Sequence, residues 1–155
     1  MVSNTDLINL YSQRILALAA SIPHTDRLAN PDATSHKRSP LCGSNVTVDV
    51  TITDGLISYF GQDVKACALG QASASVIGSA IIGRTFEELR LARDQLLAML
   101  KTSGPIPDEP FDGLEVLLPA QEYKNRHASI MLCIEASLEA FASAQKNAAT
   151  PRGAA

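Results

Sequence analysis

The clearest pattern in the chain is a strict alternation of apolar and polar residues over positions 46–53. Valine or isoleucine at every second position alternates with threonine or aspartate, which is typical of a β-strand with one buried face. Asp54-Gly55 follows, and residues 56–60 resume a β-type composition. An Asp-Gly pair between two such runs is a strong hairpin signal. The pattern therefore predicts an antiparallel hairpin that turns at Asp54-Gly55.

Apolar residues at helical spacing predict four longer helices and one short helix. The helix between Cys67 and Gly83 is rich in alanine, glycine and serine, so its surface should let another backbone approach closely. The next helix opens with Thr85-Phe86-Glu87-Glu88, which has the Thr-x-x-Glu form of a capping box. The expected helices span residues 6–20, 67–83, 85–101 and 114–118, and a last one runs from Glu122 or Asn125 to Ala144.

Between the first helix and the hairpin, residues 21–40 are polar and are interrupted by prolines. This composition predicts a loop with one short strand around Thr25–Leu28. The order of helix, hairpin and further helices indicates an α+β fold: a small, mostly antiparallel three-stranded sheet covered on one face by helices. We expect a single domain over residues 1–146 and a disordered tail over 147–155.

Charge and composition narrow the class of function. The chain has 155 residues, enough for one domain with a real core, and 13 Lys and Arg stand against 16 Asp and Glu. No basic cluster is longer than Lys37-Arg38, so nucleic acid is not an expected partner. The N-terminus lacks a signal-peptide pattern and no stretch is apolar for long enough to cross a bilayer. We therefore expect a cytoplasmic protein without a membrane partner.

No motif for hydrolase or nucleotide chemistry is present. The sequence contains no paired-carboxylate site, Ser/His/Asp arrangement, glycine-rich dinucleotide motif or P-loop. The three histidines, His24, His36 and His127, are expected to be solvated or to have capping roles. The chemistry must therefore be sought among the cysteines.

Three cysteines, Cys42, Cys67 and Cys133, make an odd count, which in a reducing compartment indicates free thiols or ligands rather than disulfides. Cys42 precedes the first hairpin strand and Cys67 follows the second, so the folded hairpin should bring them together at its open end. Cys67 also begins a helix, whose dipole favours the thiolate. Cys133 lies beside the apolar stripe of the last helix, where a buried structural thiol and a ligand are equally compatible with the pattern.

With these positions, the chain resembles the NifU N-terminal/IscU/SufU family of iron–sulfur cluster assembly scaffolds. The resemblance extends from about Thr5 to Ala144, and the long interval between Cys67 and Cys133 is more similar to the SufU branch. Four segments carry it: the first helix with Leu10-Tyr11, the Pro40-x-Cys42-Gly43 corner, Ala66-Cys67-Ala68 before Ala72-Ser73-Ala74-Ser75, and the last helix with Arg126 before Cys133.

The resemblance implies a scaffold or carrier rather than an enzyme. It implies that Cys42, Cys67 and Cys133 hold iron or a [2Fe–2S] cluster, or alternatively zinc. It also implies that sulfur comes from a PLP-dependent cysteine desulfurase, which docks on the first helix with Tyr11, and that clusters pass to recipient apo iron–sulfur proteins.

Two positions depart from the family pattern. Ser44 stands where relatives keep an aspartate ligand, and Leu132 stands where His or Lys commonly precedes the third cysteine. Three thiolates then remain without an evident fourth ligand, because a neutral hydroxyl is a poor ligand beside thiolates. Two alternatives stay open: a SufU-like zinc-dependent sulfurtransferase, and a metal-free member that acts through its partner surface.

Overall fold

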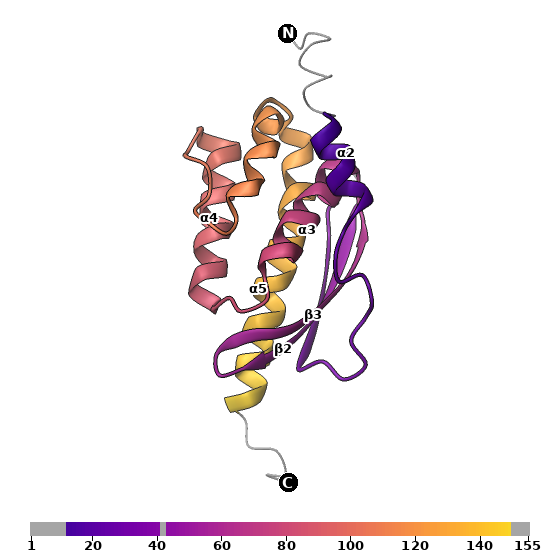
Figure 1. Cartoon of the computed structure of the whole chain (residues 1–155), viewed down its shortest axis with the longest axis vertical. Helices are drawn as coiled ribbons and strands as arrows, with labels where there is room; N and C mark the ends of the chain where they lie inside the picture. The colour runs from indigo at the N-terminus through magenta and orange to yellow at the C-terminus, as the bar shows by residue number, and fades with distance from the viewer. Residues whose placement is uncertain (1–11, 41–42, 150–155) are drawn as a thin grey trace.

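The computed structural model describes residues 12–40 and 43–149, and Figure 1 shows their arrangement. A three-stranded sheet lies on one side of the molecule and helices form the other side. No helix in these ranges is long and apolar enough to cross a membrane. The elements in chain order are α2 (Gln13–Ala20), β1 (Ala33–Arg38), β2 (Asn45–Thr53), β3 (Leu56–Lys65), α3 (Ala68–Ala80), α4 (Phe86–Thr102), the 3₁₀ helices η1 (Asp112–Glu122) and η2 (Lys124–Arg126), and α5 (His127–Ala149).

The sheet has the order β1-β2-β3, and both pairs of neighbours are antiparallel. The alternating valines of β2, Val46, Val48 and Val50, are buried on the face against which α5 packs. Helix α3 packs on α5 and α2, and α4 packs on the side of α5 away from the sheet (Figure 1). The predicted α+β fold with helices on one face of a three-stranded sheet is therefore confirmed.

The predicted hairpin joins β2 and β3. Asp54 and Gly55 both have positive φ, 54° and 77°, which is the backbone conformation of a type I′ turn. The register is irregular between Thr51 and Ile52, because Thr51 pairs with Tyr59 whereas Ile52 pairs with Ile57. One extra residue on β3 thus forms a bulge near the turn without disturbing the pairing at the open end.

The short strand predicted around Thr25–Leu28 is wrong: the third strand is β1, at Ala33–Arg38, and the earlier segment is a loop. This loop crosses the sheet face opposite α5. There the Asp49 carboxylate accepts hydrogen bonds from the Leu28 N–H and from the Arg27 guanidinium. On β3, a Cβ at Gly61 would lie 2.6 Å from the Asp26 carbonyl oxygen. The loop can therefore approach β3 this closely because Gly61 has no side chain. Hydrogen bonds to single polar atoms, rather than a periodic apolar pattern, hold this segment in place.

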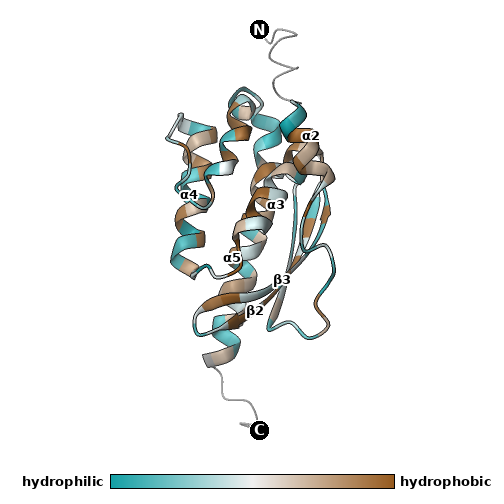
Figure 2. Ribbon diagram, viewed as in Figure 1, coloured by the Kyte–Doolittle hydropathy of each residue, from teal (hydrophilic) through white to brown (hydrophobic). Residues whose placement is uncertain are grey.

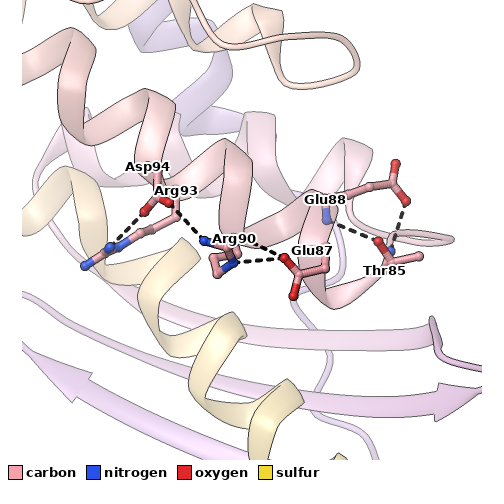
Figure 3. Close-up of polar contacts among 6 residues, drawn as sticks. All are labelled: Thr85, Glu87, Glu88, Arg90, Arg93 and Asp94. Carbon is pink, nitrogen blue, oxygen red and sulfur yellow. Dashed lines mark hydrogen bonds and ion pairs between the residues drawn. The ribbon is translucent and has the colours of Figure 1, made fainter.

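Helix α4 begins with the predicted capping box (Figure 3). The Thr85 hydroxyl accepts from the Glu88 N–H, and the Glu88 carboxylate accepts from the Thr85 N–H, both at 3.1 Å. Along the exposed side, Arg90 bonds to Glu87 and also lies 3.5 Å from Asp94. Polar and apolar residues both occur along α4 in Figure 2, and its apolar members Leu89, Leu96 and Met99 are buried. The amphipathic pattern and cap therefore agree with the structure.

Three helix boundaries differ from the prediction. The small-residue helix ends at Ala80, and Gly83, three residues further on, has φ of 85° and donates its N–H to the Ile57 carbonyl. The short helix is a longer 3₁₀ segment, η1, which includes Pro119. The last helix begins at His127 and continues to Ala149, three residues into the predicted tail, while residues 150–155 and the first part of the predicted 6–20 helix lie outside the described ranges.

Candidate functional site

The open end of the hairpin brings together the two segments that carry Cys42 and Cys67. Asn45, the first residue of β2, pairs with Lys65, the last residue of β3. Before β2, the Ser39 N–H donates to the Ser44 carbonyl at 2.8 Å, which brings together the two ends of the loop over residues 39–44. Cys42 belongs to this loop but lies outside the described residues, so its predicted contact with Cys67 stays a prediction.

Cys67 lies at the junction between β3 and α3. It is the N-cap residue of α3, with extended backbone angles, and its side chain makes no capping hydrogen bond. The thiol is half-buried, and its Sγ lies 3.5 Å from the Ser129 hydroxyl of α5. Of the two cysteines that the structure describes, Cys67 therefore combines partial exposure with a position at the end of the hairpin.

Ser129 connects Cys67 to the loop that contains Cys42. Its hydroxyl donates a hydrogen bond to the Ser44 Oγ at 3.1 Å, and both serines are buried. The three side chains come from three separate parts of the chain: the 39–44 loop, the start of α3 and the first turn of α5. They form a continuous polar row at one end of the sheet, which we call the Cys67–Ser129–Ser44 row.

The small residues of α3 make this row possible. A Cβ at Gly70 would lie 2.6 Å from the Ser129 Oγ, closer than real Cβ atoms come. One turn further on, the Ser73 hydroxyl donates to the Ile130 carbonyl at 2.8 Å. The close backbone approach predicted for the small-residue helix is thus confirmed, and its partner is the first turn of α5.

Cys133 lies about one helical turn beyond Ser129 on α5 and is only 1% exposed. Its thiol donates to the Oε1 of Gln62, a buried residue in the middle of β3, at 3.3 Å. Burial raises the pKa of the Cys133 thiol to about 12, so the thiol is protonated at neutral pH. The Gln62 amide in turn donates to the carbonyls of Pro23 and Ala74. In this arrangement Cys133 is part of a buried hydrogen-bond network.

Sequence reasoning missed Ser129. The available signal was helical spacing: Ser129 precedes Cys133 by four residues, so both project from the same side of the helix.

Two other residues were named when the chain was compared with the family pattern. Tyr11 lies outside the described ranges, and Leu132 is buried in the core. Within residues 12–40 and 43–149, no three His, Cys, Asp or Glu side chains gather closely enough to hold a metal.

The chemistry available at the row is that of one soft sulfur ligand beside two hydroxyl groups. A Cys67 thiolate can bind iron or zinc and can attack a sulfur–sulfur bond. If the Ser129 hydroxyl turned from Ser44 to Cys67, it would donate to sulfur and stabilise negative charge there. Since hydroxyls are weak ligands for these metals, the row by itself offers one strong ligand and needs a further thiolate from the adjacent loop.

Comparisons with known proteins agree on one group of relatives. No protein-family model matches the chain. The iron–sulfur cluster assembly scaffold protein IscU of Thermotoga maritima is 29% identical over 80 residues, which is 52% of this chain and 56% of that protein. The match therefore spans about half the length of the curated relative.

Solved structures match over more of the chain. The N-terminal part of a nitrogen-fixing NifU-like protein from Brucella abortus has a TM-score of 0.88 and 41% identity, over 91% of this chain and 98% of that one. A putative iron–sulfur cluster assembly scaffold protein for the SUF system from Fervidobacterium islandicum has a TM-score of 0.73. Its identity is 21%, over 86% of this chain and 98% of that one, so this second likeness concerns the fold.

Proposed function

Because the chain belongs to the family of NifU N-terminal, IscU and SufU-like scaffold proteins, we propose that it is a scaffold or carrier in iron–sulfur cluster assembly. Its cargo is iron or a nascent [2Fe–2S] cluster. The observation that carries the proposal is the half-buried Cys67 thiol beside Ser129, at the end of the hairpin where the Cys42 loop closes.

Cys42 and Cys67 supply the thiolates in this proposal. Two peptide units separate Cys42 from Ser44, so covalent geometry keeps their Cα atoms within about 7 Å of each other. Ser44 accepts a hydrogen bond from Ser129, which in turn lies 3.5 Å from the Cys67 sulfur. These contacts support a shared site for the two cysteines. Thiolates are the ligands that iron–sulfur clusters use most.

The role of Cys133 as the third ligand remains a prediction, because Cys42, another ligand of the predicted site, lies outside the described residues. The geometry of Cys133 favours a different role. Without metal, the Cys133 thiol donates to Gln62 and its pKa is raised by burial, so it would have to give up this hydrogen bond and its proton to bind a metal. We therefore propose Ser129 as the third group at the site and Cys133 as a core residue.

We further propose that sulfur arrives as a persulfide from a cysteine desulfurase. The Cys67 thiolate attacks the outer sulfur, a new S–S bond forms, the old one breaks, and the desulfurase thiolate leaves, so no external oxidant or reductant is needed. Clusters then pass to recipient apo iron–sulfur proteins. The cytoplasm predicted from the sequence is a compartment in which such thiols remain reduced.

Anaerobic reconstitution with ferrous iron and sulfide tests the proposal. We expect thiolate-to-iron charge-transfer absorption in the wild-type chain and its loss in Cys42→Ser and in Cys67→Ser. Cys133→Ser is the matched control, because it removes a thiol elsewhere, and it should load normally. Absence of the absorption in folded wild-type protein would contradict the proposal, and equal loss in Cys133→Ser would restore the three-cysteine site.

Metal analysis of the protein as purified addresses the two alternatives. About one tightly held zinc ion per chain would favour the zinc-dependent sulfurtransferase, which needs four ligands. The metal-free alternative would be favoured if Cys42→Ser and Cys67→Ser both kept full function in cells. Ser44 in place of a carboxylate weakens the zinc alternative, since it offers a neutral hydroxyl.

A further inference from the structure

A groove with a positively charged rim lies beside the loop that carries Cys42. Its walls come from the end of β1, the last turns of α4, the start of η2 and the first two turns of α5. It encloses about 330 Å³, with an apolar floor that includes Leu97 and Met131. Lys37, Arg38, Lys101 and Lys124 surround this floor, and we call the whole the basic groove.

The charges of the basic groove are mostly uncompensated. Lys37 bonds to Glu139 at 3.1 Å, but Arg38, Lys101 and Lys124 have no ion-pair partner among the residues the structure describes. Glu135 is the one carboxylate that lines the groove. Elsewhere on the described surface, many cations are already paired; these are Arg27, Lys65, Arg84, Arg90 and Arg93.

Two of the cations lie near a buried histidine, His127, which also lines the groove. Burial lowers the pKa of His127, and the positive charges of Lys101 and Lys124 lower it further. The imidazole Nε2 is 2.8 Å from the Ala120 carbonyl, so it donates there and the ring is held in place. Lys101 from α4 and Lys124 from η2 therefore line the same groove as His127, although they are far apart in the sequence.

We propose that the basic groove binds an acidic segment of a partner protein, with one apolar side chain on the floor and carboxylates against the rim. Charge complementarity selects this occupant, because a chain of net charge −3 concentrates unpaired cations here. The apolar floor fits a side chain better than a free phosphate. The groove borders Ser39-Pro40, so a segment bound there lies next to the Cys42 loop.

The test uses the full chain and a short fluorescein-labelled peptide with glutamates on both sides of a central leucine. Fluorescence anisotropy should show binding that weakens as salt is raised, because exposed charge pairs are screened. The double variant Lys101→Glu/Lys124→Glu should lose about tenfold in affinity. Arg14→Glu, an exposed cation on α2 that does not line the groove, is the matched control and should bind normally.

Several results would overturn the inference. These are equal binding of a peptide with lysines in place of glutamates, equal binding to the double variant, and no binding at all. Competition by inorganic phosphate or by anionic lipid vesicles that matches competition by unlabelled peptide would point to another occupant. Iron loading of the double variant, measured separately, should equal that of the wild type, so failure here is distinguishable from failure of the proposed scaffold function.

Discussion

At the scale of single residues, two side chains on α5 one helical turn apart have different surroundings. Ser129 lies between Cys67 and Ser44 at the end of the sheet. Cys133 is equally buried, at 1% exposure, but its thiol donates to Gln62. A displacement of about 6 Å along the helix axis therefore gives two buried residues different hydrogen-bond partners.

Cys133→Ala should leave iron loading unchanged but lower the free energy of unfolding by about 1–2 kcal/mol. The reason is that the substitution removes a buried atom and leaves the Gln62 Oε1 without its donor. Urea unfolding gives the stability change, and iron content after anaerobic gel filtration gives the loading. A large loss of iron with little loss of stability would show that Cys133 is a ligand.

Ser129→Cys should increase the retention of iron in the presence of a competing chelator, because a third thiolate is then adjacent to Cys67. Ser137→Cys is the matched control: it adds a buried thiol two turns further along α5 and should not change retention. If both variants, or neither, retained more iron, Ser129 would not be at the metal site.

At the scale of elements, the site depends on how closely α3 approaches α5. Gly70 and Ser73 face the first turn of α5, and their small size permits the contact with Ser129 and Ile130. Gly70→Ala should cost about 1–3 kcal/mol, because the new Cβ must displace Ser129 or Ala66. It should also weaken iron loading, since Ser129 moves relative to Cys67.

The control for Gly70→Ala is Ser79→Ala, on the same helix. Ser79 is exposed, and its hydroxyl bonds only to the Ser75 carbonyl of its own helix. It should retain normal iron loading, measured by the same anaerobic reconstitution. Normal loading in a folded Gly70→Ala protein would show that the α3–α5 approach does not control the site.

The start of α4 gives a prediction that concerns stability alone. Thr85→Ala removes the hydroxyl that accepts from the Glu88 N–H, and should lower the free energy of unfolding by about 1 kcal/mol. Thr85→Ser keeps the hydroxyl and should be close to the wild type in thermal or urea unfolding. Equal losses in the two variants would mean that the methyl group, rather than the cap, is responsible.

At the scale of the whole molecule, the buried carboxylate of Asp49 joins the loop over residues 24–32 to the sheet. Burial of Asp49 by itself would raise its pKa, but hydrogen bonds from Arg27, Thr34 and the Leu28 N–H outweigh burial and lower the pKa below its usual value. A lowered aspartate pKa contributes stability above the unfolded-state value of about 3.9, and this contribution is lost as the pH falls through the lowered folded-state value.

Asp49→Asn should therefore be about 2 kcal/mol less stable than the wild type at neutral pH, and this difference should shrink as the pH falls below about 4. The measurement is urea unfolding from pH 3 to pH 7, taken at about one-unit steps. Asp94→Asn is the control, because that exposed carboxylate pairs only on the surface and should change little at any pH. A constant difference across the range would contradict the assigned role of Asp49.

His127 adds a separate pH dependence to the wild type. Its pKa is lowered by burial, so the unfolded chain takes up a proton that the folded chain does not. Stability should therefore begin to fall below the ordinary histidine value of about 6.5. This pH range lies above the range in which the contribution of Asp49 is lost. His127 is also present in both the wild type and Asp49→Asn, so the difference in stability between the two proteins reports on the Asp49 carboxylate.

The sequence by itself determined the features that depend on neighbours along the chain. The alternation over residues 46–53 and the Asp54-Gly55 turn specify the hairpin, because strand period and turn geometry are local properties. The capping box at Thr85 is equally local. The α+β order and the family resemblance follow from the succession of such elements, and both agree with the structure and its relatives.

Only the tertiary structure decided which side chains meet across elements. The loop over residues 24–32 has no apolar period, because it is held by single polar contacts to Asp49 and by the missing side chain at Gly61. Cys67 contacts Ser129 and Cys133 donates to Gln62, because the packing of α5 against the sheet fixes which residue each turn of the helix meets. Distances between helices and strands have no signature in local sequence, and the site depends on them.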